Sequence, residues 1–150
     1  MPAARSLALA LLLPLAALAA PIYPDPSRAA TDIEAALREA SATHRRVLVD
    51  FGGDWCTDCK VLDAYLKRPE NAALLAHGYV VVHVNVGARG IDRNFEVARR
   101  YGIPLEKGVP ALAVLDADGK VVYSQKKGEF ESMRHMDSKS VNEFLVRWAP

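Results

Sequence analysis

The chain of 150 residues contains two cysteines, Cys56 and Cys59, both within the segment FGGDWCTDCK at residues 51–60. Positions at this spacing lie about one turn of a helix apart, so the two sulfur atoms can close a small disulfide ring. Such a cysteine pair can bind a metal ion, serve as a structural bridge or carry out thiol–disulfide exchange. The residues around the pair must distinguish these three kinds of chemistry.

The neighbouring residues disfavour metal binding and haem attachment. A structural zinc site takes four Cys or His ligands at short spacing, and c-type haem attachment needs a histidine directly after the second cysteine, where this chain has Lys60. The histidines are scattered instead: His44, His77, His83 and His135. A structural disulfide remains an alternative for an exported protein, although so short a loop restricts the unfolded chain only slightly. Redox chemistry is the leading interpretation.

Two predicted elements position the cysteine pair. Residues 47–51 (VLVDF) predict a short buried strand, and the apolar spacing after Cys56 predicts a helix that ends near Pro69. The N-terminus of a helix favours negative charge, and such a position can lower the pKa of a thiol from about 8.5 to roughly 3.5–7.5. We therefore expect Cys56 to be the exposed attacking thiol. Cys59, one turn further into the helix, is expected to be the shielded thiol that resolves the mixed disulfide.

The rest of the chain alternates helices and strands. A helix is expected to begin at Thr31, where Glu34 completes a capping box. Further helices are predicted at 69–78, 91–102 and 137–148, and further strands at 79–86, 110–116 and 120–124, the last two forming a hairpin. Strands separated by helices are expected to pair in parallel and the hairpin strands antiparallel. The predicted fold class is therefore α/β, with a mixed central sheet covered by helices.

The N-terminus has the pattern of a secretory signal peptide. Arg5 precedes an apolar run over 7–20, which is about 14 residues long and shorter than the roughly 20 that span a bilayer. Ala17 and Ala19 fit the small-residue rule for a cleavage site. We therefore predict a signal peptide over 1–20 and a protein that is periplasmic or otherwise exported. A single membrane anchor is the alternative.

Composition restricts the partners of the mature chain. Without Arg5, 18 basic and 18 acidic residues remain, and this neutral balance favours neither nucleic acid nor an anionic membrane as partner. No later run approaches the length of a membrane span, so no stable membrane insertion is expected after signal cleavage. Residues 21–30 contain three prolines and are expected to be an extended N-terminal segment. Residues 31–150 are expected to form one domain.

Two segments resemble landmarks of thioredoxin-fold proteins. VLVDFGGDWCTDCK (47–60) resembles the active-site segment of that family, and GVPALAVLDADGKVV (108–122) resembles its cis-proline and following hairpin. The resemblance covers about residues 31–149 and implies a thioredoxin-like three-layer sandwich with a mixed central sheet. The export signal, the Thr57-Asp58 dipeptide, the longer segment at 101–110 and a long loop at 124–140 make the chain look more like periplasmic thioredoxin-like proteins and the C-terminal domain of DsbD than like a cytosolic thioredoxin.

The resemblance implies catalytic roles for three residues. It implies that Cys56 is the nucleophile, that Cys59 is the resolving cysteine, and that Asp50 is a buried acid that accepts the proton of Cys59. An apolar environment makes a carboxyl group harder to ionise, which suits a proton acceptor near neutral pH; a capped or water-bonded strand end is the alternative for Asp50. His83 falls on the adjacent strand, where the family often has a lysine that faces this acid, or else it faces solvent.

The same resemblance implies substrate-binding roles for Trp55, Val109 and Pro110. Pro110 would be the cis-proline, and the backbone of Val109 would pair with a substrate peptide beside the nucleophile. The longer link before Pro110 is expected to reshape the substrate groove. The implied partners are protein thiols or disulfides and an unidentified redox-recycling protein, and neither a metal nor another cofactor is expected.

Besides the longer link before Pro110, two features depart from the family pattern. Asp58, between the cysteines, would oppose thiolate formation unless its side chain faces solvent. The 124–140 loop holds Met133, His135 and Met136, whose sulfur and imidazole groups could bind Cu(I) in an exported protein. The simpler interpretation of these residues is a flexible loop with incidental Met and His. The alternative function for the chain is a metal-binding, copper-handling or assembly factor on the same fold, whose cysteines ligate the metal.

Overall fold

The computed structural model describes residues 19–150. The predicted signal peptide at 1–20 lies almost entirely outside the described residues. Within residues 19–150, no helix has the length and apolar character needed to cross a membrane.

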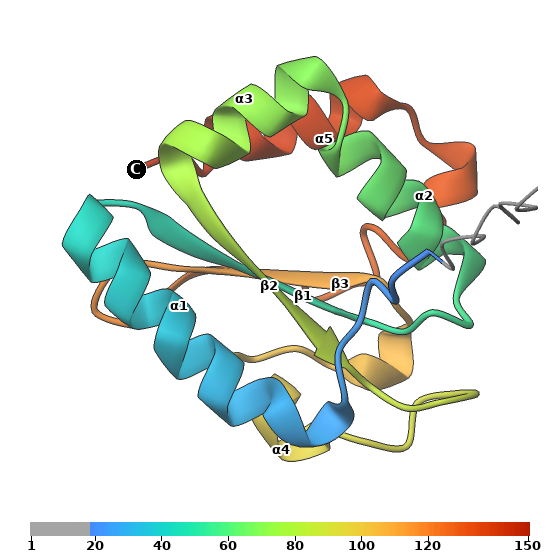
Figure 1. The fold of residues 1–150 in the computed structure, drawn as a ribbon. Coiled ribbons are helices and arrows are strands. Elements are labelled where there is room, and N and C mark those ends of the chain that lie inside the picture. Colours follow the sequence, from blue (N-terminus) through green and yellow to red (C-terminus); the bar gives the residue numbers. More distant parts are fainter. Residues whose placement is uncertain (1–18) are drawn as a thin grey trace, which may run out of the picture.

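A four-stranded sheet in the order β2-β1-β3-β4 forms the middle layer of the fold (Figure 1). Strand β1 (Arg46–Gly52) pairs in parallel with β2 (Tyr79–Asn85) and antiparallel with β3 (Ala111–Leu115). Strand β4 (Val121–Ser124) pairs antiparallel with β3. The predicted strands and the mixed α/β sheet are confirmed. The expectation that all helix-separated strands pair in parallel is wrong for β3, which lies antiparallel beside β1 although helices separate the two in sequence. The chain that includes α4 returns β3 in the opposite direction to β1 and β2, so this connection is not a parallel crossover.

Helices cover both faces of this sheet. In Figure 1, α1 (Ala29–Thr43) and α4 (Phe95–Arg100) lie on one side, and α2 (Thr57–Leu66), α3 (Pro69–Gly78) and α5 (Ser138–Arg147) lie on the other. This arrangement is the expected three-layer sandwich. Asp137 caps α5 by accepting a hydrogen bond from the backbone N–H of Ser140 at 3.0 Å, as predicted for the start of that helix.

The alternation of β1 explains how one acid comes to lie beneath the cysteine helix. Val47, Val49 and Phe51 pack into the core that α1 covers. Leu48 packs into the second core, with Leu62 of α2. Because successive strand side chains point to opposite faces, Asp50 shares the face of Leu48 and lies on the side covered by α2.

Two predicted helix starts are wrong. A 3₁₀ helix over Pro26–Arg28, capped by the Asp25 side chain, continues directly into α1 at Ala29, so Thr31 lies inside the helix and forms no capping box. The chain from 21 to 30 is therefore extended only in its first part. Helix α4 begins at Phe95 rather than residue 91, because the N–H groups of Asp92 and Arg93 both donate to the carbonyl of Val86 and fold the preceding residues into a tight loop.

The 124–140 loop packs against the domain. It contains a 3₁₀ helix over Met133–His135, and the Met133 side chain is fully buried in the core beside α2 and α5. The hydroxyl of Tyr65 donates a hydrogen bond of 3.0 Å to the carbonyl of Met136. Since the sulfur of Met133 is enclosed by apolar side chains, it does not share an accessible site with His135.

Candidate active site

Cys56 and Cys59 form a disulfide at the N-terminus of α2, with Cα atoms 5.2 Å apart. Cys56 is the N-cap residue of the helix, and its Sγ accepts a hydrogen bond of 3.1 Å from the backbone N–H of Cys59. Cys56 is 7% exposed and Cys59 is 0% exposed. Of the two sulfur-bearing residues, the one at the helix start is therefore the more accessible.

The turn before Cys56 is fixed by contacts from two other segments. The backbone N–H of Cys56 donates to the carbonyl of Gly53 at 3.0 Å. The indole N–H of Trp55 donates to the carbonyl of Gly87 at 2.9 Å, which leaves the ring 38% exposed beside the nucleophile. A side chain at Gly53 would collide with the indole of Trp55, so this turn requires glycine there.

The start of β3 lies against Cys56. The Val109–Pro110 peptide bond is cis, and the carbonyl oxygen of Val109 lies 3.6 Å from Sγ of Cys56. Gln125 holds the backbone that follows. Its side-chain amide donates to the carbonyl of Pro110 at 3.2 Å and accepts from the N–H of Leu112 at 3.1 Å. The structure thus brings together the cysteine pair, Trp55, Val109 and Pro110.

Asp50 is completely buried and makes two hydrogen bonds through a single oxygen. The hydroxyl of Tyr23 donates to Oδ2 at 2.7 Å, and Nδ1 of His83 lies 2.9 Å from the same oxygen. The other oxygen, Oδ1, has no hydrogen-bond partner among the described residues. The side chain of His83 therefore faces the acid, which settles the alternatives left by the sequence.

The buried acid changes the protonation of both of its partners. Burial opposes protonation of His83, but the hydrogen bond and the charge of Asp50 outweigh it, so the pKa of His83 is raised. Burial and the charge of Asp50 also raise the pKa of Tyr23 well above its usual value. Tyr23 therefore stays a neutral hydrogen-bond donor to the acid throughout the physiological range.

Asp58 does not face solvent. Its Oδ1 accepts hydrogen bonds from the backbone N–H of Arg134 at 2.8 Å and from Nε of Arg134 at 3.1 Å. The 124–140 loop thereby places a positive charge on the acid that lies between the cysteines. This pairing offsets the negative charge that would otherwise oppose a thiolate at Cys56.

Sequence reasoning missed three residues of this site. Tyr23 belonged to a proline-rich segment that was expected to be extended, although an aromatic residue between prolines was a signal that the segment packs. Gln125 and Arg134 belonged to a region interpreted as a loop, and nothing in their local sequence indicates long-range partners.

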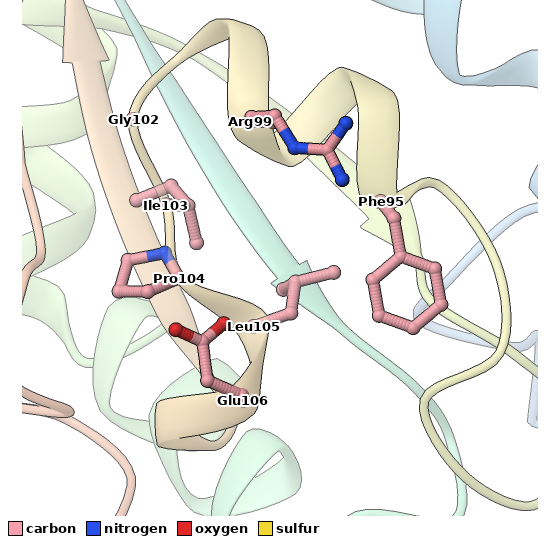
Figure 2. Close-up of a pocket in the computed structure, with 7 residues that line it drawn as sticks. All are labelled: Phe95, Arg99, Gly102, Ile103, Pro104, Leu105 and Glu106. Atoms are coloured by element: carbon pink, nitrogen blue, oxygen red, sulfur yellow. The ribbon is translucent and has the colours of Figure 1, made fainter.

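A cavity among the described residues lies apart from the cysteine site. It has a volume of about 310 Å³ and lies between α4 and the segment 102–106. Figure 2 shows Phe95 and Leu105 directed toward each other across it, with Arg99 and Glu106 at its margin. None of the cysteine-site residues lines this cavity, so the long link before Pro110 forms a separate hollow. Among residues 19–150, no three His, Cys, Asp or Glu side chains gather as a metal site.

This geometry defines a class of protein. A mixed sheet, a cysteine pair at the N-terminus of the helix that follows the first strand, and an X–Pro segment packed on the first cysteine form a thioredoxin-like thiol–disulfide oxidoreductase. Residues 28–117 match the family described as thioredoxin-like, and the chain belongs to that family.

Several known proteins are similar to this chain. The crystal structure of a disulphide isomerase from Xylella fastidiosa Temecula1 is 38% identical, covers 84% of this chain and 95% of its own, and superposes with a TM-score of 0.78. The oxidised C-terminal domain of DsbD from Neisseria meningitidis, 22% identical, shares the fold with a TM-score of 0.50 over 83% of this chain and 97% of its own. The thiol:disulfide interchange protein DsbD of Ralstonia nicotianae is 28% identical over 92 residues, which are 61% of this chain but only 14% of that protein.

Proposed function

We propose that this thiol–disulfide oxidoreductase acts outside the cytoplasm and exchanges disulfides with protein substrates through Cys56 and Cys59. The observation that carries the proposal is the approach of the Val109 carbonyl oxygen to 3.6 Å from Sγ of Cys56. A backbone group and a half-exposed Trp55 ring beside a reactive sulfur suit an extended peptide better than a small thiol. The leader pattern at 1–20 and the similarity to proteins named DsbD support export.

The first step of the exchange takes place at Cys56. In the reducing direction, the Cys56 thiolate attacks one sulfur of a substrate disulfide and forms a mixed disulfide. The substrate S–S bond breaks, and its electron pair leaves on the other substrate sulfur, which takes up a proton from solvent. The N-terminus of α2 and the backbone N–H of Cys59 stabilise the attacking thiolate.

The second step releases the substrate. Cys59 transfers its proton to Asp50, and its thiolate attacks Sγ of Cys56. The mixed disulfide breaks, the second substrate sulfur leaves as a thiolate, and the Cys56–Cys59 disulfide of the structure forms. Because Oδ2 of Asp50 is already occupied by Tyr23 and His83, Oδ1 is the oxygen that accepts the proton. A second redox protein returns the pair to the dithiol, and oxidation of a substrate runs the same steps in reverse.

The substrate class is tested by measuring the rates at which the Trp55→Ala variant reacts with two disulfides. One is a peptide disulfide, and the other is the small disulfide 5,5′-dithiobis(2-nitrobenzoate). The variant should lose rate with the peptide and keep its rate with the small disulfide, because Trp55 contacts only the larger substrate. Trp148→Ala, at the C-terminal end of α5, is the matched control and should affect neither reaction. Equal losses with both disulfides in Trp55→Ala would argue against a peptide-binding groove.

Export is tested with a reporter. Residues 1–30 fused to an alkaline phosphatase that is active only after export should give phosphatase activity in a bacterial host, and Leu11→Arg in the leader should abolish it. An inactive fusion with an intact leader would contradict export.

A further inference from the structure

The segment before α1 reaches the buried acid from outside the family match. The match begins at residue 28, whereas Tyr23 is 2% exposed and donates to Oδ2 of Asp50 at 2.7 Å. In Figure 1 this segment, in blue, runs past the end of the sheet beside α2 and continues into α1. The contact is therefore an addition to the matched part of the domain.

The Tyr23 hydroxyl also lies next to the resolving sulfur. A side chain on Gly52 would collide both with the Tyr23 hydroxyl and with Sγ of Cys59, which would lie 2.8 Å from the added Cβ. The Tyr23 hydroxyl and Sγ of Cys59 therefore both lie close to the position that a Cβ atom on Gly52 would occupy. Since the hydroxyl is also bonded to Asp50, Tyr23 contacts the buried acid on the side of the domain where the resolving sulfur lies.

The segment is held in place by four hydrogen bonds in addition to that of the hydroxyl. The carboxylate of Asp54, in the active-site turn, accepts from the N–H groups of Ile22 at 2.9 Å and Tyr23 at 3.2 Å. The side-chain amide of Asn85, at the end of β2, donates to the carbonyl of Pro24 at 2.9 Å, and that of Asn94 donates to the carbonyl of Pro26 at 2.9 Å. These anchors connect the segment to the active-site turn, to the sheet and to α4.

We propose that Tyr23 is a positioning residue for the resolving step: its hydroxyl holds Oδ2 of Asp50 so that Oδ1 is free to take the proton of Cys59. The inference rests on the proposed role of Asp50. A buried carboxylate with one donor removed is less stable as an anion and is free to turn. Without the hydroxyl, fewer molecules present Oδ1 of Asp50 in the orientation that the resolving step needs.

Four other titratable groups among the described residues act on the Tyr23 hydroxyl or on its partner Asp50. His83 on β2 bonds to the same carboxylate oxygen, and its ring meets the Tyr23 ring edge-on at 5.3 Å. Asp54 in the turn and Asp63 on α2 add negative charge, and Lys67, just after α2, offsets that of Asp63. Because Tyr23→Phe leaves all of these groups in place, a change in the pH dependence of the resolving step reports the hydroxyl itself.

The test separates the two steps with 5,5′-dithiobis(2-nitrobenzoate). The reduced protein releases one thionitrobenzoate when Cys56 attacks and a second when Cys59 resolves the mixed disulfide, and stopped-flow absorbance resolves both phases from pH 5 to 9. Tyr23→Phe should slow the second phase about tenfold near neutral pH, as expected for loss of a hydrogen bond to a charged group, and should displace its pH profile upward. The first phase should not change.

Tyr79→Phe is the matched control, because it removes another buried tyrosine hydroxyl bond of 2.7 Å, to the carbonyl of Leu145. It should leave both phases as in the parent protein. The double variant Tyr23→Phe/Asp50→Asn should be no slower than Asp50→Asn alone, because the hydroxyl acts through the acid.

The outcomes separate the proposed role of Tyr23 from that of Asp50. If Asp50→Asn slows the second phase and Tyr23→Phe reproduces the parent profile, the role of Tyr23 is overturned and that of Asp50 stands. If Asp50→Asn does not slow the second phase, the proposed role of Asp50 fails as well. Should Tyr23→Phe not fold, Asn85→Ala, which loosens the segment and keeps the hydroxyl, must displace the second-phase profile upward; an unchanged profile overturns the proposal.

Discussion

The carbonyl oxygen of Val109 lies 3.6 Å from Sγ of Cys56, although 53 residues separate the two in sequence. The antiparallel register of β1 and β3 pairs Phe51 with Ala111, so β3 begins where β1 ends and where α2 starts. The sheet therefore places a backbone acceptor beside the reactive sulfur. This juxtaposition is the physical basis for assigning a peptide substrate to the cysteine pair.

Gln125→Leu should weaken the strand that presents Val109. The substitution leaves the Pro110 carbonyl and the Leu112 N–H without their buried side-chain partners, which should lower the free energy of unfolding by about 2 kcal/mol. Urea unfolding of the oxidised protein measures the loss. An unchanged unfolding midpoint would show that Gln125 does not stabilise this backbone.

Asp50→Asn should slow the resolving step about a hundredfold near neutral pH, as expected for loss of a general base. The effect should fade at high pH, where hydroxide deprotonates Cys59 directly, and the protein should still fold because the side chain keeps its shape. The pH profile of mixed-disulfide release measures it. Asp63→Asn on α2 removes the same charge nearby, from an acid paired with Lys67, and serves as control. Turnover like that of the parent from pH 6 to 8 would make Asp50 only structural.

The Asp58–Arg134 pair should set how readily Cys56 ionises. Arg134→Gln exposes Cys56 to the uncompensated charge of Asp58, so the pH profile of Cys56 alkylation should move to higher pH. Asp58→Asn removes that charge and should move the profile to lower pH. The double variant should behave like Asp58→Asn, since the arginine acts through the acid. Displacement of both single variants in the same direction would contradict this coupling.

His83 should make the stability of the oxidised protein depend on pH. Its pKa is raised in the folded state above the usual value of 6.5, because the hydrogen bond and charge of Asp50 outweigh burial. The folded protein therefore holds this proton more tightly than the unfolded chain. The stabilisation is fully present below about pH 6.5 and is lost as the pH rises through the folded pKa.

His83→Gln removes this titration and provides the comparison. The difference in free energy of unfolding between the parent and the variant should be largest below about pH 6.5 and should shrink above it. Denaturant unfolding at a series of pH values measures it. A difference that grows with pH would contradict the assigned direction.

The sequence predicted the elements and the chemistry of the site because both depend on local patterns. The strands around Asp50 and Val82 and the helix that starts at Cys56 follow from apolar spacing within a few residues. The Cys-x-x-Cys pair and the Val109–Pro110 segment stand out as residue types. The antiparallel register that joins them could not be predicted, because it depends on which strands become neighbours.

The residues that adjust the active site could not be predicted from local sequence patterns. Tyr23, Gln125 and Arg134 each act on partners many residues away, and their burial follows from packing. The capping box at Thr31 failed for a related reason: Asp25 starts a 3₁₀ turn that carries the helix past that position. Tertiary contacts overrode a sound local signal there.

The most direct test of the central claim is mass spectrometry of Cys59→Ser after reaction with a peptide disulfide. The variant keeps the attacking thiol and lacks the resolving one, so it should accumulate one equivalent of peptide joined to Cys56, released by dithiothreitol, while Cys56→Ser should accumulate none. The absence of this adduct, together with stoichiometric retention of a metal ion by the parent dithiol, would contradict thiol–disulfide exchange and favour the metal-binding alternative.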